Sequence, residues 1–279
     1  MSAAAATTPA REAVAAAVDA LVAAGVSEPR LDAELVLAEA TGWDRARIAA
    51  NPDQPLPPGA SRKFAAMVRR RLRREPVAYI LGRKGFRGIE LAIDSRVLIP
   101  RPETELLVEV AVELEPANVT DIGTGSGALA LAIADELPAA TVMATDTSTG
   151  ALEVAGANAE RLGLAERVTL AEGTLTNRVA ELLVANLPYV SEAEWEGLAP
   201  EIREHEPREA LVAGPTGVEA IESILAEIAR SATPPETIAL EVGAGQSEAV
   251  AELTRSAGYG ELDVRRDLAG IDRVVVGHR

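Results

Sequence analysis

The stretch VTDIGTGSGALALAIA places a glycine-rich loop between an apolar run and a helical one. The apolar run ends at Ile122, and a helix is predicted to begin near Ala128. Glycines let the backbone turn tightly and approach a ligand without a Cβ clash, while free N–H groups at a helix start attract an anionic group. A strand, a nucleotide-binding loop and a helix are therefore expected here, and the loop residues are Gly123, Thr124, Gly125, Ser126 and Gly127.

A carboxylate stands where a ribose would need one. Asp146 lies nineteen residues after Gly127 and closes the apolar strand TVMAT. In such a position a carboxylate accepts both hydroxyls of a ribose. Gly123, Gly125 and Ala128 also satisfy the dinucleotide pattern G-x-G-x-x-A. The loop alone therefore leaves NAD and S-adenosylmethionine both open.

The rest of the chain alternates between strands and helices after about residue 100. This alternation predicts an α/β fold with a mostly parallel sheet covered on both faces. Only LAGI separates the last two predicted strands, LDVRRD and DRVVVGHR, so these two must be antiparallel. Earlier apolar spacing predicts a small helical unit. The expected organisation is a flexible tail (1–10), a helical substrate-docking domain (11–82), a β-hairpin connector (83–100) and the α/β domain (101–279).

The stretch VANLPYV distinguishes between the possible ligands. Asn186 is predicted to lie just past the end of a strand, where ligands bind in open α/β sheets. Its side chain offers an acceptor and a donor, Leu187 before Pro188 is held extended with its carbonyl outward, and Tyr189 adds a flat face. These groups fit a planar NH₂ group, with two acceptors for its two N–H bonds and a ring to stack on its plane.

Several motifs together resemble one family. DIGTGSG, ATD and NLPY look like the motifs of class I S-adenosylmethionine-dependent methyltransferases that modify planar NH₂ groups. With PVAYILGRKGFRG, VLIPRPETELLVE, EHEPREALVAG, EVGAGQSEAV and DLAGIDRVVV, the chain from about Leu31 onward resembles the release-factor glutamine methyltransferase (HemK-like) family. The resemblance implies a class I methyltransferase fold, Rossmann-like with a reversed last strand, after an N-terminal helical domain that helps to dock the substrate.

The resemblance also implies the chemistry. It implies methyl transfer from S-adenosylmethionine, giving S-adenosylhomocysteine, to the side-chain amide N5 of the Gln in the Gly-Gly-Gln loop of bacterial peptide chain release factors. The expected catalytic residues are Asn186, Leu187, Pro188 and Tyr189. Those expected to bind the cofactor are Gly123, Thr124, Gly125, Ser126, Gly127, Asp146, Leu175 and Asn186, with Thr104 or Glu105 near the methionine end.

Two departures from the family pattern stand out. Leu187 replaces the first Pro of the usual Asn-Pro-Pro-Tyr; only its backbone carbonyl is needed, so the chemistry should survive. Where the family tends to carry an acid after the third strand, this chain has Thr174. The adenine-side contact is therefore assigned to Thr174 or Leu175.

Charge and composition bear on partners and location. The net charge of −16 disfavours stable nucleic-acid binding, yet residues 60–87 carry ten Lys or Arg against one acid, a net of +9 that leaves −25 elsewhere. That window is either a solvated helix face or a docking patch. There are no Cys, two distant His and no bilayer-length apolar run, and the alanine-rich start lacks a basic n-region. We expect a cytoplasmic monomer without a metal or a membrane.

Two other functions stay open. An adenine-N6 methyltransferase acting on rRNA or DNA would use a similar Asn-Leu-Pro-Tyr motif, and the basic window keeps this alternative in play. A non-catalytic S-adenosylmethionine-binding module is the other, against which the intact Asn-x-Pro-Tyr stands. A dehydrogenase is a more distant alternative.

Overall fold

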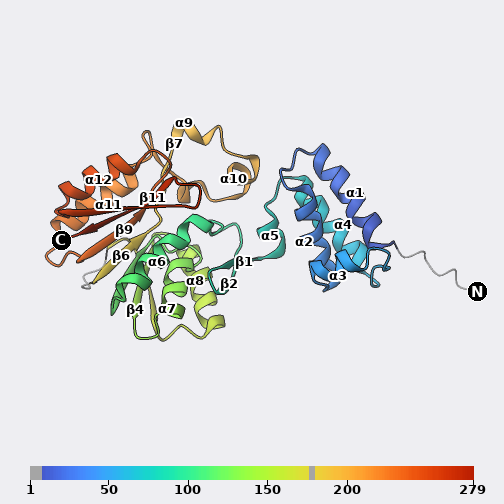
Figure 1. The fold of residues 1–279 in the computed structure, drawn as a ribbon, viewed down its shortest axis with the longest axis horizontal. Coiled ribbons are helices and arrows are strands. Elements are labelled where there is room, and N and C mark those ends of the chain that lie inside the picture. Colours follow the sequence, from blue (N-terminus) through green and yellow to red (C-terminus); the bar gives the residue numbers. More distant parts are fainter. Residues whose placement is uncertain (1–7, 176–179) are drawn as a thin grey trace, which may run out of the picture. The chain divides into compact units, whose positions relative to one another are not determined.

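The chain divides into two units in the computed structural model, which describes residues 8–175 and 180–279. The described residues up to Gly82, together with Pro200–His205, form the first unit. Arg83–Ala199 and Glu206–Arg279 form the second (Figure 1). The short segment Pro200–His205 thus lies in the sequence of the second unit and packs with the first, which the sequence pattern did not indicate.

The first unit is helical. The two helices predicted at its start are present, ending on Ala24 and on Gly42, a glycine with φ of 71° as a left-handed helix end requires. Residues 1–7 of the expected tail lie outside the described residues, and the first helix already begins at Ala10. Two short helices were not predicted, because five or six residues show no clear helical period. The helices are α1 (Ala10–Ala23), α2 (Pro29–Thr41), α3 (Arg45–Ala50), α4 (Ala60–Leu72), α5 (Val77–Leu81) and α10 (Pro200–His205).

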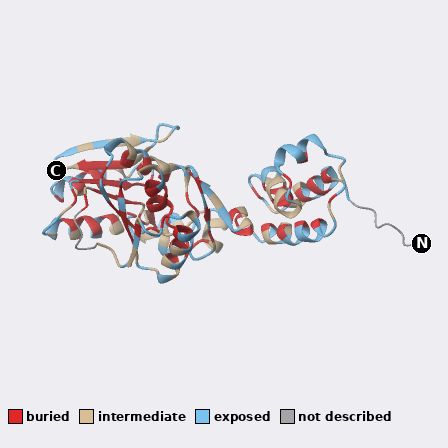
Figure 2. Ribbon diagram, turned by 90° about the horizontal axis from the view of Figure 1, so that it is seen from below, coloured by how far each residue is buried: buried red, intermediate tan, exposed pale blue. Residues whose placement is uncertain are grey.

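An apolar cluster holds these helices together. Leu21 of α1, Leu37 of α2 and Phe64 of α4 turn into a shared core with Trp43 and Met67. Figure 2 shows the buried faces of these helices turned inward and their outer faces exposed. The unit therefore has a core of its own.

The basic window contains more than one kind of side chain, and one kind is buried in ion pairs of the helical unit. Arg71 is only 5% exposed and bonds to Asp32 at 2.6 Å and to Glu201 of α10 at 2.8 Å. Arg74 bonds to the same Glu201 at 2.7 Å and to the carbonyl of Ala24 at 2.9 Å. These two arginines stabilise the helical unit from within. A count of charges in the sequence cannot distinguish them from exposed arginines that could bind a partner.

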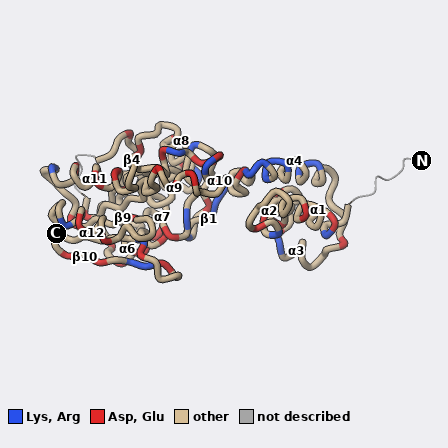
Figure 3. The backbone as a smooth tube through the Cα atoms, turned by 90° about the horizontal axis from the view of Figure 1, so that it is seen from above, with Lys and Arg blue, Asp and Glu red and all other residues tan. Residues whose placement is uncertain are grey.

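Another kind lies in a row on α4, where Figure 3 shows Lys and Arg along the helix. Arg62, Arg69 and Arg73 are exposed, and within the described part of the chain their side chains make no hydrogen bond or ion pair. Arg62 and Arg69 are seven residues apart and so lie on one face of α4, and Arg73 follows directly after the helix end at Leu72. We call these three residues the α4 basic row.

A β-hairpin opens the second unit, as predicted. Strands β1 (Arg83–Phe86) and β2 (Ile89–Ala92) pair antiparallel, with Phe86 opposite Ile89. Arg87, in the turn beside Gly88, has a φ of 49°. In α8 (Thr149–Leu162), the buried side chain of Asn158 accepts from the Ala92 N–H at 2.8 Å and donates to the Ala92 carbonyl at 2.9 Å. The hairpin is thereby fixed to the α/β core.

Within the described residues, the main sheet has seven strands in the order β10-β11-β9-β6-β3-β4-β5. Adjacent strands from β9 to β5 are parallel, and β11 runs antiparallel to both of its neighbours. The predicted α/β class, with a mostly parallel sheet, a reversed last strand and a helical unit ahead of it, is confirmed. The strands are β3 (Asn118–Ile122), β4 (Thr141–Asp146), β5 (Val168–Glu172), β6 (Leu182–Ala185), β9 (Thr237–Glu241), β10 (Glu261–Arg266) and β11 (Asp272–His278).

None of the helices among the described residues combines the length and the apolar run that a membrane crossing requires.

Helices pack along the main sheet, and a small pair of parallel strands, which was not predicted, follows β6 in the chain. The helices of the unit are η1 (Pro102–Thr104), α6 (Glu105–Leu114), α7 (Ala128–Glu136), α8 (Thr149–Leu162), α9 (Glu192–Trp195), η2 (Arg208–Ala210), α11 (Glu219–Arg230) and α12 (Ser247–Ser256). The small pair is β7 (Val190–Ser191) and β8 (Val212–Gly214).

Removal of the Arg71 side chain should destabilise the helical unit. Arg71→Ala leaves the buried Asp32 carboxylate without its partner, a loss that typically costs ~3–5 kcal/mol of unfolding free energy. Arg69→Ala on the same helix removes an exposed arginine and is the matched control. Denaturant unfolding of the full chain, with hydrogen–deuterium exchange of α2 and α4, measures both; equal protection in the two variants would contradict a structural role for Arg71.

Candidate functional site

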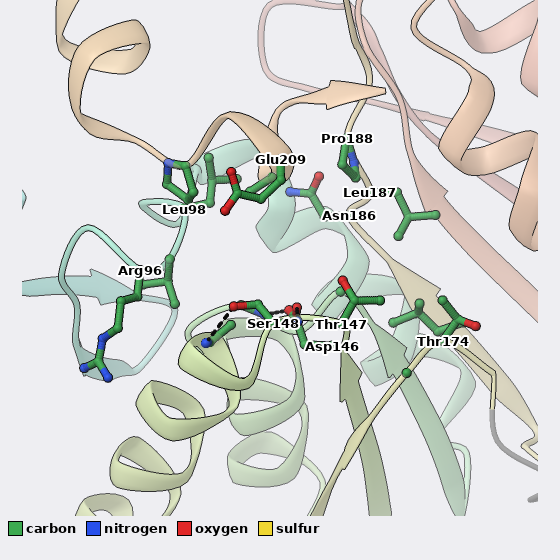
Figure 4. Close-up of a pocket in the computed structure, with 18 residues that line it drawn as sticks. Arg96, Leu98, Asp146, Thr147, Ser148, Thr174, Asn186, Leu187, Pro188 and Glu209 are labelled. Carbon is green, nitrogen blue, oxygen red and sulfur yellow. Dashed lines mark hydrogen bonds between the residues drawn. The ribbon is translucent and has the colours of Figure 1, made fainter. Parts of the chain in front are cut away.

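Three strands end side by side and bring the predicted site residues together. Ile122, the last residue of β3, lies opposite Thr145 of β4 and Ala185 of β6. The next residues along each strand are Gly123, Asp146 and Asn186, and all three line one pocket. Figure 4 shows Asp146 and Ser148 on one side of this pocket, with Asn186 across it.

The backbone of the glycine loop is shaped so that a ligand in the pocket can come close to it. Gly123 and Gly125 line the pocket with φ of 74° and 56°. Gly127 precedes α7 with φ of 83°, and a Cβ there would lie 2.8 Å from Leu131 Cδ1. Only glycine fits at this last position, because both the backbone conformation and the packing exclude a side chain.

The remaining loop residues face inward. Thr124 and Ser126 are 5% and 3% exposed. The N–H groups of Gly123 and Thr124 both donate to the Thr145 carbonyl at 2.9 Å, which ties the loop to the end of β4. Asn158 donates to the Ser126 carbonyl at 2.9 Å. The same side chain therefore holds both the loop and the hairpin, a role that the sequence did not reveal.

Asp146 has a structural task that the sequence did not indicate. Its half-buried carboxylate accepts from the N–H of Gly125 at 2.9 Å and from the N–H of Ser148 at 2.9 Å. Each bond uses a different carboxylate oxygen, and each oxygen has a second lone pair. The carboxylate can therefore hold the loop and still accept hydroxyl groups from a ligand in the pocket.

The Asn-Leu-Pro-Tyr segment follows β6 directly, as predicted. Asn186, Leu187 and Pro188 line the pocket, and Asn186 Nδ2 donates to Thr104 Oγ1 at 2.9 Å. Tyr189 lies in a neighbouring hollow with Gln246, which donates to the Tyr189 carbonyl at 2.8 Å. The bond to Thr104 uses one N–H of the Asn186 amide, and no hydrogen bond to its carbonyl oxygen is found among the described residues, so this oxygen can accept from a ligand.

Two buried carboxyls lie close to these residues. Burial raises the pKa of Asp121, on β3, to about 7, and the nearby Asp146 charge adds to the rise. Burial likewise raises the pKa of Glu241, at the end of β9, to about 7, while the hydroxyls of Thr104 and Tyr189 oppose the rise. Burial, helped by the Glu241 charge, also raises the pKa of Tyr189. Sequence patterns alone did not mark either carboxyl, because each reads as one polar residue in an apolar strand.

Two residues were expected at the adenine end of the ligand and two at its methionine end, and the members of each pair have different surroundings in the structure. Thr174 lines the pocket, and its hydroxyl donates to Glu227 of α11 at 3.1 Å. Leu175 packs against the apolar cluster that includes Ile221. Thr104 holds Asn186, whereas Glu105 accepts from the Arg87 N–H at 3.1 Å. Residues 176–179, which follow Leu175, lie outside the described residues.

Further pocket residues come from segments that the sequence did not connect with the site. They are Arg96, Val97 and Leu98 after the hairpin, and Pro207, Glu209 and Ala210 from the segment around η2. Glu206 anchors this last segment, because it accepts from the Ile99 N–H at 3.1 Å and pairs with Arg101 at 2.5 Å. The EHEPREALVAG motif thus forms part of the pocket wall.

The arrangement suits a nucleoside beside a planar amide. The glycine loop lets the backbone come close to a ligand, Asp146 provides acceptors for hydroxyl groups, and Asn186 provides a carbonyl oxygen. Within residues 8–175 and 180–279, no group of three or more His, Asp or Glu side chains has an arrangement that could hold a metal ion.

Family models and solved structures show which known proteins this chain resembles. A family model described as PrmC N-terminal domain matches residues 12–82, and one described as Ribosomal protein L11 methyltransferase (PrmA) matches residues 104–190. Among solved structures, the hMettl16 catalytic domain in complex with the MAT2A 3'UTR hairpin 6 is similar, with a TM-score of 0.56 and 15% identity over 67% of this chain and 75% of that chain. This likeness supports the methyltransferase fold alone.

Sequence relatives are much closer. A release factor glutamine methyltransferase of Gloeobacter violaceus is 45% identical over 85% of this chain and 86% of its own length. One of Moorella thermoacetica is 41% identical over 96% of this chain and 98% of its own length. The chain therefore belongs to the release factor glutamine methyltransferase family.

Proposed function

We propose that the protein transfers a methyl group from S-adenosylmethionine to the side-chain amide N5 of the Gln in the Gly-Gly-Gln loop of peptide chain release factors. The observation that carries the proposal is the orientation of Asn186, whose Nδ2 bonds to Thr104 at 2.9 Å in the pocket that also contains Asp146. Its carbonyl oxygen is thereby directed to a ligand. An N–H donor such as a glutamine amide is the matching partner.

The cofactor side of the pocket fits the nucleoside of S-adenosylmethionine. Asp146 accepts the ribose hydroxyls through its remaining lone pairs, and Gly123 and Gly125 let the backbone approach the methionine portion. Thr124, Ser126 and Gly127 support this loop from behind. Thr174 faces the adenine side, and Leu175 supports it from the apolar cluster. When bound, S-adenosylmethionine supplies a reactive methyl group on a sulfonium.

The amide side orients a weak nucleophile. Asn186 Oδ1 and the Leu187 carbonyl accept the two N–H bonds of the substrate amide, and Pro188 restricts Leu187 to an extended conformation. Tyr189, which lines the neighbouring hollow, would pack beside the amide plane from that side. Methyl transfer would form one N–C bond and break one C–S bond, with the sulfur keeping the electron pair and the amide proton passing to solvent. The chain contributes position and electrostatics to this displacement.

An adenine-N6 methyltransferase of rRNA or DNA is the second candidate. Asn-Leu-Pro-Tyr would also suit the NH₂ of adenine, and the α4 basic row would suit a phosphate backbone. The net charge of −16 opposes this assignment, and relatives at 40–45% identity bear the release-factor name. A non-catalytic binding module would leave the directed carbonyl of Asn186 without a use. The match to the ribosomal protein L11 methyltransferase model ends at residue 190 and does not indicate which group receives the methyl.

The cofactor assignment predicts the effect of Asp146→Ala. A hydrogen bond to a charged group contributes ~1.5–3 kcal/mol, so S-adenosylmethionine should bind about tenfold more weakly or worse. Asp135→Ala, which removes an exposed carboxylate from α7, is the control and should bind as wild type does. Isothermal titration calorimetry measures both, and an unchanged affinity in Asp146→Ala would remove this residue from the cofactor site.

The acceptor assignment is tested with labelled S-adenosylmethionine and a recombinant release factor. We expect label on the release factor, none on a copy whose Gly-Gly-Gln loop carries Gln→Ala, and none on rRNA. Asn186→Ala should lower kcat about a hundredfold, because misplacement of the amide by ~1 Å costs that much, with a smaller effect on cofactor affinity. Wild-type turnover in Asn186→Ala, or label on rRNA but not on the release factor, would refute the amide assignment.

We further propose that the α4 basic row helps the release factor to associate. Reversing Arg62, Arg69 and Arg73 to Glu should lower kcat/KM at low salt and flatten its salt dependence, with kcat nearly unchanged, because exposed charges act mainly on association. The control reverses three exposed arginines elsewhere, Arg30, Arg230 and Arg255, with the same change in net charge. Equal kcat/KM for the two triple variants would identify the row as a solvated face.

A further inference from the structure

Glu241 is a buried carboxyl that the proposed reaction does not use directly. It ends β9, next to the end of β6, where Leu240 pairs with Ala185. Asn186 is the residue that follows Ala185, so the carboxyl and the asparagine belong to neighbouring strand ends. Glu241 is 1% exposed, and its Oε2 has no hydrogen-bond partner in the described structure. Burial of a carboxyl oxygen without a hydrogen bond lowers the stability of the folded protein, so a function that offsets this cost is expected.

Thr104 connects Glu241 to Asn186. Its hydroxyl is 4% exposed and accepts from Asn186 Nδ2 at 2.9 Å, and the same hydroxyl interacts with the Glu241 carboxyl. A hydroxyl has one proton to donate. Because the Asn186 N–H already points at the Thr104 oxygen, the Thr104 proton is free for another acceptor, and the Glu241 carboxyl is a group with which this hydroxyl interacts.

The direction of these bonds decides how Asn186 is turned. An asparagine side chain can rotate its amide by half a turn and exchange oxygen for nitrogen at little steric cost. In the turned state, an NH₂ group would face the NH₂ of a substrate amide, and two donors would oppose each other. When the Thr104 proton is donated to the Glu241 carboxyl, the Thr104 oxygen can only accept a hydrogen bond from Asn186. The turned state would place the Asn186 carbonyl oxygen against this acceptor, so it is disfavoured.

We propose that Glu241, acting through Thr104, is a positioning residue that keeps the carbonyl oxygen of Asn186 directed at the substrate amide. The inference rests on the function proposed above and deepens it. The Tyr189 hydroxyl interacts with the same carboxyl, so one buried group serves both polar side chains of the Asn-Leu-Pro-Tyr segment. Other charges that act on Glu241 are Glu103, just before Thr104, and Arg273 of β11.

The arrangement tolerates either protonation state of the carboxyl. Burial raises the pKa of Glu241 to about 7, so both forms exist near neutral pH. A protonated carboxyl keeps one carbonyl acceptor, and the partnerless Oε2 can carry the proton. A glutamine would imitate this form, with a carbonyl oxygen for Thr104 and an NH₂ in place of Oε2, whereas a leucine would offer no acceptor.

The experiment compares variants along this chain of contacts. Thr104→Val removes the hydroxyl with little change of shape, and Thr104→Ser retains it. Glu241→Leu removes the acceptor, and Glu241→Gln retains one. Thr254→Val is the matched control, because Thr254 of α12 is also fully buried and its hydroxyl has no hydrogen-bond partner within the described residues. Each variant is assayed as full-length protein for kcat with the release factor and for S-adenosylmethionine affinity.

We expect Thr104→Val and Glu241→Leu to lower kcat about 10- to 100-fold, because the Asn186 amide loses its fixed orientation. Cofactor affinity should stay near that of wild type. Thr104→Ser, Glu241→Gln and Thr254→Val should keep most of kcat. A wild-type kcat in folded Thr104→Val, or equal losses in Thr104→Val and Thr254→Val, would overturn the proposal.

A second measurement does not depend on turnover. In ¹⁵N-asparagine-labelled protein, the side-chain NH₂ signal of Asn186 should shift in Thr104→Val and Glu241→Leu and stay in place in Thr254→Val. An unmoved signal in the first two variants would contradict the positioning role even if the release factor proved not to be the substrate. Failure of wild type to methylate the release factor, with the NMR shifts as expected, would instead refute the proposed function alone.

Discussion

Parallel pairing of β3 with β4 on one side and with β6 on the other is the constraint on which the site depends. Parallel strands present their carboxyl ends at one edge of the sheet. The residues that follow these ends are therefore neighbours, although Gly123 and Asn186 are 63 positions apart in the chain. The glycine loop and Asn186 can thus share a pocket without any long loop to bring them together.

Buried polar contacts behind the pocket keep its parts in place. Asn158 holds the hairpin and the glycine loop at once, and Asp146 holds the loop to β4. Thr104 holds Asn186 from the other side. Each contact satisfies a buried group that would otherwise carry a desolvation cost, so precision at the site and stability of the unit have the same physical source.

Local sequence signals predicted the parts of the site that depend on short spacing. The glycine loop, Asp146 and Asn186 each follow an apolar run that forms a strand, and periodicity identifies such runs. The contacts of Thr104 with Asn186 and of Arg71 with Glu201 join residues 82 and 130 positions apart, and no spacing rule reports them. For the same reason, the basic window looked uniform in sequence, although Arg71 is buried and Arg69 is exposed.

The central claim is that this strand edge holds a nucleoside and a glutamine amide together. A crystal structure of the protein with S-adenosylhomocysteine and a peptide that contains Gly-Gly-Gln tests it most directly. The account predicts the ribose hydroxyls at the Asp146 carboxylate, and the glutamine NH₂ between Asn186 Oδ1 and the Leu187 carbonyl, facing the sulfur. A nucleoside bound away from Asp146, or a glutamine amide outside the Asn186 pocket, would contradict it.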